Sequence, residues 1–411
     1  MKTVSFREMK GIGAAYWAVQ AVLLLVILVG LGAAHYMETE GHWVTGMSNQ
    51  IVWGLPHVFA VFLIVTASGE LNLASVASVF GKAPYKPLSR LSALVAIAHL
   101  VGGLMILVLD LGRPDRLVIA MTHYNFKSIF AWNILLYNGF IGLAVVYLWT
   151  MMERRMNPYT KQAGLAIFVW RVLLTTGTGS IFGFLVARDA YNAAIMAPMF
   201  IVLSFSYGLA IYLMTVMTLS YWCERPIGEA ILARLRNLLG TFVAGGFYFF
   251  LAYHLTNLYI TQRHGVEAFL LNGESIYSKV FWVGQILVGT ALPLALLYAP
   301  ALRRNRVAMY AACALIVVGG LSQMYVTIIG GQAYPLSIFP GYDVLNSSFG
   351  DGQVGQYVPT IYEALLGIAG FAFASFLVFV VARLLPILPE SLTDADIDPR
   401  LLVDPYHKAD A

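Results

Sequence analysis

Charged residues and cysteines are both scarce in this chain of 411 residues. Asp, Glu, Lys and Arg make up only 11% of it, whereas a soluble domain typically carries about a quarter. The two cysteines, Cys223 and Cys313, cannot hold an iron–sulfur cluster, which takes about four thiolates. We expect two inert thiols, with a disulfide as the alternative. The shortage of charge excludes a globular domain surrounded only by water.

Hydrophobic residues make up 59% of the chain, and the mean hydropathy is +0.75. The first apolar run follows Lys2, Arg7 and Lys10, but it is too long for a signal-peptide core and no small-residue cleavage site follows it, so we expect a retained helix. Runs of about twenty apolar residues cross a bilayer as helices. The sequence therefore predicts an all-α polytopic membrane protein with ten transmembrane helices, near 14–35, 51–79, 88–110, 127–152, 161–186, 194–222, 238–262, 276–299, 307–329 and 359–385.

The basic residues gather in alternate loops. Lys82, Lys86 and Arg90, for example, follow the second run. Similar groups precede the first run and follow the fourth, sixth, eighth and tenth runs. Because cytoplasmic loops carry an excess of Lys and Arg, both termini are predicted to be cytoplasmic. The acidic residues 386–411 are then a solvated cytoplasmic tail. The outer loop 330–358 has no Lys or Arg and is either a docking surface or an irregular surface loop.

Several ionisable residues fall inside apolar runs, where each costs roughly 2.5–3.5 kcal/mol to insert. In the third run, His99, Gly103, Ile106 and Asp110 share one helical face. Each ionisable side chain inside a run either takes part in function or only forms a hydrogen bond to a neighbouring helix. The set is His57, Glu70, His99, Asp110, Arg171, His254 and Glu363.

A charged turn, "DLGRPDR" (110–116), follows the third run on the side that is otherwise poor in positive charge. We expect Asp110 and Arg113 to be functional there, with a helix-ending salt bridge between the two as the alternative. Trp53 and His57, one helical turn apart, lie near the same surface. A carboxylate, a guanidinium and an imidazole beside an apolar groove suit the head of a quinone, although a transporter could use the same groups.

Three stretches carry a resemblance to a known family. "LVLDLGRPDRL" (107–117), "YNFKSIFAWN" (124–133) and "IVWGLPHVFAVFLIVTASGELN" (51–72) resemble the NrfD/PsrC family of haem-free membrane subunits, which exchange electrons between quinones and an iron–sulfur subunit. Residues 35–57 and the ten-span length are most similar to the P subunits of DsrMKJOP complexes of sulfur metabolism. The resemblance implies two four-helix bundles, 51–186 and 194–329, with flanking helices 14–35 and 359–385.

The resemblance also implies a site for menaquinone or ubiquinone at the outer end of the first bundle. Asp110, Arg113 and His57 match the expected catalytic positions, and Trp53, Tyr124, Lys127 and Arg188 complete the expected binding site. The Asn-Phe-Lys-Ser turn at 125–128 departs from the Pro- and Gly-containing turn of many relatives, which leaves the role of Lys127 open. Some relatives are proposed to move protons through buried acidic and histidine residues, and Glu70, His99 and Arg171 would serve here.

The expected partners are an extracytoplasmic ferredoxin-like iron–sulfur subunit, a multihaem cytochrome c and further subunits of a Dsr-type complex in the bacterial cytoplasmic membrane. No metal site and no nucleic-acid partner are expected. Two alternatives stay open. One is a b-type cytochrome with His57 and His254 as haem ligands. The other is a secondary transporter, for which Gly102-Gly103 and Gly245-Gly246 are the only hint of interrupted helices.

Overall fold

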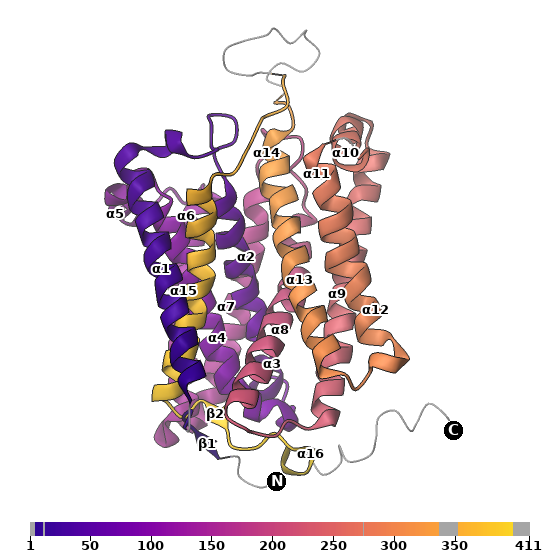
Figure 1. Cartoon of the computed structure of the whole chain (residues 1–411). Coiled ribbons are helices and arrows are strands. Elements are labelled where there is room, and N and C mark those ends of the chain that lie inside the picture. Colours follow the sequence, from indigo (N-terminus) through magenta and orange to yellow (C-terminus); the bar gives the residue numbers. More distant parts are fainter. Residues whose placement is uncertain (1–4, 11–12, 274, 337–351, 398–411) are drawn as a thin grey trace.

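The computed structural model describes residues 5–10, 13–273, 275–336 and 352–397. Within them, ten helical segments are long and apolar enough to span a membrane, which confirms the predicted all-α, ten-span fold (Figure 1). The segments are α1 (Ala14–Glu40), α2 (Leu55–Glu70) with α3 (Asn72–Ser78), η2 (Ala83–Leu88) with α4 (Ser89–Leu109), α6 (Ile129–Met152), η4 (Arg154–Tyr159) with α7 (Thr160–Gly183), α8 (Met196–Trp222), α9 (Glu229–Tyr259), α11 (Ile276–Lys279) with η6 (Val280–Ala291) and α12 (Leu292–Tyr298), α13 (Arg306–Tyr325) with η8 (Val326–Gly330) and α14 (Gly331–Ala333), and α15 (Ile361–Leu384).

Short elements mark the two ends of the bundle. We call one end the α5 face; it carries η1 (His42–Val44), η3 (Pro114–Arg116), α5 (Leu117–Thr122), η5 (Thr261–Arg263) and α10 (His264–Leu271). The other end, the β face, carries β1 (Phe6–Arg7), β2 (Leu388–Pro389), η7 (Pro300–Leu302) and α16 (Asp394–Ile397). The loops with most Lys and Arg lie on the β face, which the charge pattern predicts to be cytoplasmic.

The long helices pack as two groups of four with a flanking pair. Helices α2, α4, α6 and α7 contact one another, as do α8, α9, α12 with η6, and α13. The groups join where α2 and α7 pack on α8, and α15 lies against α2 and α4 with α1 outside it. Small residues allow these close contacts. A Cβ on Gly69 would lie 1.6 Å from the carbonyl oxygen of Ser204 on α8.

The chain after α15 folds back onto the β face. β2 pairs antiparallel with β1, and Ile387, Leu388 and Leu392 are buried. The prediction of a solvated tail from residue 386 is therefore wrong for this stretch, because its apolar side chains cover the helix ends; residues 398–411 lie outside the described part of the chain. Asp394 accepts hydrogen bonds from the backbone N–H groups of Ala230 and Ile231. This cap lets α9 begin at Glu229, well before the predicted start at 238.

Candidate functional site

Asp110 lies at the end of α4, on the α5 face of the first bundle. It is the C-cap residue of that helix, and only 6% of it is exposed. Gly103, two turns earlier on the same helix face, lets α4 approach α2 closely: a Cβ there would lie 2.9 Å from the carbonyl oxygen of Ala60. The close approach brings the start of α2 beside the Asp110 carboxylate.

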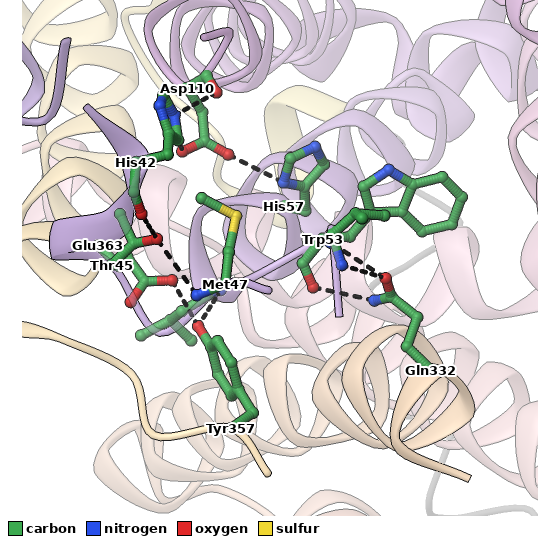
Figure 2. Close-up of polar contacts among 11 residues, drawn as sticks. His42, Thr45, Met47, Trp53, His57, Asp110, Gln332, Tyr357 and Glu363 are labelled. Atoms are coloured by element: carbon green, nitrogen blue, oxygen red, sulfur yellow. Dashed lines mark hydrogen bonds and ion pairs between the residues drawn. The ribbon is translucent and has the colours of Figure 1, made fainter. Parts of the chain in front are cut away.

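Two histidines meet Asp110 (Figure 2). The Nδ1 atom of His57, in the first turn of α2, lies 2.9 Å from Asp110 Oδ2. The Nε2 atom of His42, in η1, lies 3.0 Å from the backbone oxygen of Asp110 and 3.9 Å from its Oδ1. Neither carboxylate oxygen has an aligned hydrogen-bond donor. A buried carboxylate in this state retains hydrogen-bonding capacity for a ligand or a proton.

Aromatic rings form a wall beside this pair. The Trp53 indole stacks on the His57 ring, with centroids 6.3 Å apart and planes at 29°. The edge of Trp53 meets Phe130 at the start of α6, 5.9 Å away. Phe130 is 44% exposed, so the wall continues to the outer surface of the bundle. A flat apolar surface next to a polar pair can hold a planar ring that needs hydrogen bonds at one edge.

The loop that carries Trp53 is held from behind. Gln332 Oε1 accepts hydrogen bonds from the backbone N–H groups of Val52 and Trp53, and its Nε2 donates to the Trp53 carbonyl (Figure 2). The guanidinium of Arg188 donates to the carbonyl oxygens of Gln332 and Gln50. The structure therefore places Arg188 behind Trp53, where it positions the loop.

Glu363 is a structural acceptor. Its carboxylate accepts hydrogen bonds from the N–H groups of Thr360 and Gly46, from the Thr360 hydroxyl and from the Tyr357 hydroxyl. Burial and the neighbouring Glu363 carboxylate raise the pKa of Tyr357 well above its usual range, so this phenol stays a donor. The Tyr357 oxygen also accepts from the N–H of Leu55. These hydrogen bonds connect the first turn of α2 to the start of α15.

Arg113 does not pair with Asp110, so the salt bridge expected as the alternative is absent. Helix α4 ends at Leu109, and the Arg113 guanidinium lies 3.0 Å from Asp115 Oδ2. The hydrogen bond from Arg113 holds the pKa of Asp115 below its usual range. Lys127 is exposed, and Tyr124 stacks on Phe126. These cationic and aromatic side chains line the outer turns, and the structure shows no bond from them to Asp110.

Glu70 and His99 form a second polar pair, deep in the first bundle. The Nδ1 atom of His99 lies 3.0 Å from Glu70 Oε1, and both residues are buried. Arg171 does not pair with Glu70, its conceivable partner from the sequence. It donates to the carbonyl oxygen of Ser68 and lies over the Phe205 ring. The eleven residues from His99 to Asp110 put this pair about 16 Å from the outer site.

His254 lies in the second group of helices. Its Nδ1 is 2.7 Å from Glu267 Oε2, and it lines a cavity with Tyr253 and Gln285. His57 lies beside Asp110 in the first group of helices, so each histidine already has its own carboxylate partner in its own group, which disfavours a shared haem. Among the residues that the structure describes, no three His, Cys, Asp or Glu side chains are arranged to hold a metal ion.

The fold and the site define a polytopic membrane protein with a carboxylate–histidine site at one end of its first bundle. The family model described as "Polysulphide reductase, NrfD" matches residues 43–335. The chain belongs to this NrfD family, as the resemblance predicts.

Three relatives are similar over much of their length. The integral membrane subunit of an Hdr-like menaquinol oxidoreductase from Archaeoglobus fulgidus is 28% identical, over 96% of this chain and 99% of the relative. The integral membrane subunit of a menaquinone reductase from Nitratidesulfovibrio vulgaris is 22% identical, over 88% and 89%. Protein NrfD from Escherichia coli is 24% identical, over 69% and 96%.

Sequence reasoning missed two residues of the outer site. His42 lies in the loop "EGHWVTG" (40–46), where a titratable residue so near Trp53 is the one available signal. Gln332 follows the ninth apolar run and carries no local signal, because only the packing of α14 against residues 52 and 53 gives its amide a role.

Proposed function

We propose that this protein is the haem-free, quinone-reactive subunit of a membrane-bound redox complex. It exchanges electrons between the quinone pool and an iron–sulfur subunit docked on the α5 face. The observation that carries the proposal is the buried Asp110 carboxylate, which has unused hydrogen-bonding capacity and pairs with His57, the ring on which Trp53 stacks. Relatives named for menaquinol oxidation and menaquinone reduction support it.

The chemistry follows from the two ends of the site. Oxidation of a quinol releases two electrons and two protons, and reduction of a quinone takes them up. Asp110 accepts a proton at a carboxylate oxygen and His57 accepts one at its ring, and both return them in the reverse direction. Trp53 and Phe130 contact the quinone ring and hold it in place. The electrons pass to the docked iron–sulfur subunit. Arg113, Tyr124 and Lys127 form the outer rim of the proposed binding site.

The partner surface lies next to the site. Val118, Ile119 and Phe126 expose 64%, 58% and 60% of their area on the α5 face. Such apolar exposure beside an electron-exchange site supports a docked subunit. The loop 330–358 was the other docking candidate, and most of it, residues 337–351, lies outside the described part of the chain.

We further infer a complex of sulfur metabolism, of the DsrMKJOP type, in a bacterial cytoplasmic membrane with the β face toward the cytoplasm. A ferredoxin-like iron–sulfur protein and a multihaem cytochrome c are its expected partners. The support is the similarity of residues 35–57 and the basic loops of the β face. Affinity purification of the tagged protein from gently solubilised membranes, followed by mass spectrometry, tests this; recovery with an unrelated set of subunits would contradict it.

A proton relay through the first bundle completes the proposal. Glu70 and His99 form a buried acid–base pair, and the Arg171 guanidinium binds α2 two residues before Glu70. Ionisable groups buried at membrane depth are typical of proton pathways. The pair supports proton movement coupled to the quinone chemistry.

Asp110→Asn tests the quinone site. The amide keeps the shape but cannot take a proton, so quinol-dependent reduction of an acceptor by the purified complex should fall by about 100-fold or more. Asp115→Asn, in the same turn but exposed and paired with Arg113, is the matched control. Both variants should assemble equally in native gels. Full activity in Asp110→Asn would refute the assignment.

A further inference from the structure

Two small cavities lie inside the second group of helices, away from the proposed quinone site. One has a volume of about 30 Å³ and is lined by Tyr253, His254 and Gln285 among others. The other, of about 20 Å³, is lined by Ser206, Tyr207 and Gln285. Each is large enough for one or two water molecules, since a single water needs roughly 10–15 Å³ of this volume. Gln285 and Phe250 line both cavities, so the two spaces are neighbours.

Polar atoms without hydrogen-bond partners lie at or next to the smaller cavity, which we call the inner cavity. Ser206 lines this cavity, is 2% exposed, and its hydroxyl has no hydrogen-bond partner. Gln323 does not line the cavity but contacts Tyr207, which does; it is 1% exposed, and its Nε2 has no partner either. The other end of that amide, Gln323 Oε1, accepts from the Tyr207 hydroxyl at 2.6 Å. Buried donors are nearly always satisfied by protein or water. An apolar cavity would stay dry, but this one offers the two to four polar partners that hold a water.

An ionisable cluster that includes His254 borders the larger cavity. Glu267, 1% exposed, lies 2.7 Å from His254 and accepts a hydrogen bond from Asn257 at 2.8 Å. Arg263 donates to Asn257 and is only half-buried, which links the cluster to the α5 face. Val243 is the residue of α9 at the inner cavity that lies farthest from His254. The two residues are about 16 Å apart along the helix axis.

The backbone at Gln285 is unusual. Residues Val280–Ala291 form a π-helix, which widens the turn and is frequently found at functional sites. The wide turn brings Gln285 between the two cavities, and Thr290 donates to its carbonyl oxygen at 3.2 Å. Of the two residues that line both cavities, Gln285 is the polar one, and its amide can bond to water.

We propose that the second group of helices binds water in both cavities and that these waters form a proton-conducting series. The series runs from the His254–Glu267 pair on the α5 face, past Gln285, to Ser206, Tyr207 and Gln323 at the contact with α2. His254 takes up and releases the proton, the waters pass it on, and the amides and hydroxyls only orient them. The water sites do not depend on the proposed quinone function, whereas the conducting role rests on it.

Gln285→Leu tests the water sites, because it removes the amide shared by both cavities. A cryo-electron microscopy map of the intact complex, sharp enough to show waters, should hold density in both cavities of the natural protein and lose it in this variant. Gln20→Leu, which removes a buried amide from α1, should keep the density. Ser206→Ala is a milder second variant that should lose only the inner water. Dry cavities in the natural protein would overturn the proposal.

The conducting role is tested in liposomes that contain the intact complex. Gln285→Leu should lose protons released per electron, while its quinol oxidation with an uncoupler stays at the level of the natural protein and of Gln20→Leu. An unchanged ratio, with the waters gone, would overturn the conducting role. Absence of quinol oxidation in the natural protein would instead defeat the proposed function and leave the water sites standing.

Discussion

Gln332→Leu is the perturbation for which the structure gives the clearest magnitude. The side chain is 2% exposed and makes four hydrogen bonds, of 2.8–3.0 Å, to residues 52, 53 and 328. At about 0.5–1.5 kcal/mol for each bond, their loss is worth about 2–6 kcal/mol. Arg188 and Tyr357 still hold the two ends of the loop, so we expect the lower half of that range.

Amide hydrogen exchange measures the effect. A loss of about 2–4 kcal/mol speeds exchange of the 50–55 backbone by roughly 30- to 900-fold. Because Trp53 then loses its fixed position, the KM for quinol should rise more than kcat falls. Gln50→Leu is the control: it lies in the same loop, and its side chain makes one hydrogen bond, to the carbonyl of Gln353. Unchanged exchange and KM in Gln332→Leu would show that the Gln332 amide does not position Trp53.

Two further predictions concern the first bundle. Arg113→Gln should lower quinol oxidation by less than about tenfold, well below the effect of Asp110→Asn, because its guanidinium is exposed and bound to Asp115; an equal loss in the two variants, measured side by side, would return Arg113 to the reacting centre. Glu70→Gln should reduce the protons moved per electron while the uncoupled electron-transfer rate stays near normal, since the Glu70–His99 pair lies about 16 Å from the quinone site; a proton ratio equal to that of the natural protein in liposomes would argue against the relay.

Periodicity predicted one polar face of the third span. The face shared by His99, Gly103 and Asp110 does turn toward α2, where it meets Glu70 and His57. The partner of Arg113 was not predictable in the same way. A stripe of residues continues only while the helix does, and α4 stops before the Pro114 turn, so Arg113 bonds locally.

The sequence by itself determined that this protein spans a bilayer, how many spans it has and which family it belongs to. A bilayer requires long apolar helices, and each such helix is a run of consecutive residues that can be recognised in the sequence. Only the tertiary structure decided which polar groups meet. His42, Asp110 and Gln332 come from segments far apart in the sequence, and the buried tail at 387–392 depends on helix ends that it covers. Contacts of this kind depend on helix packing distances set by small residues such as Gly69 and Gly103, which local sequence patterns do not encode.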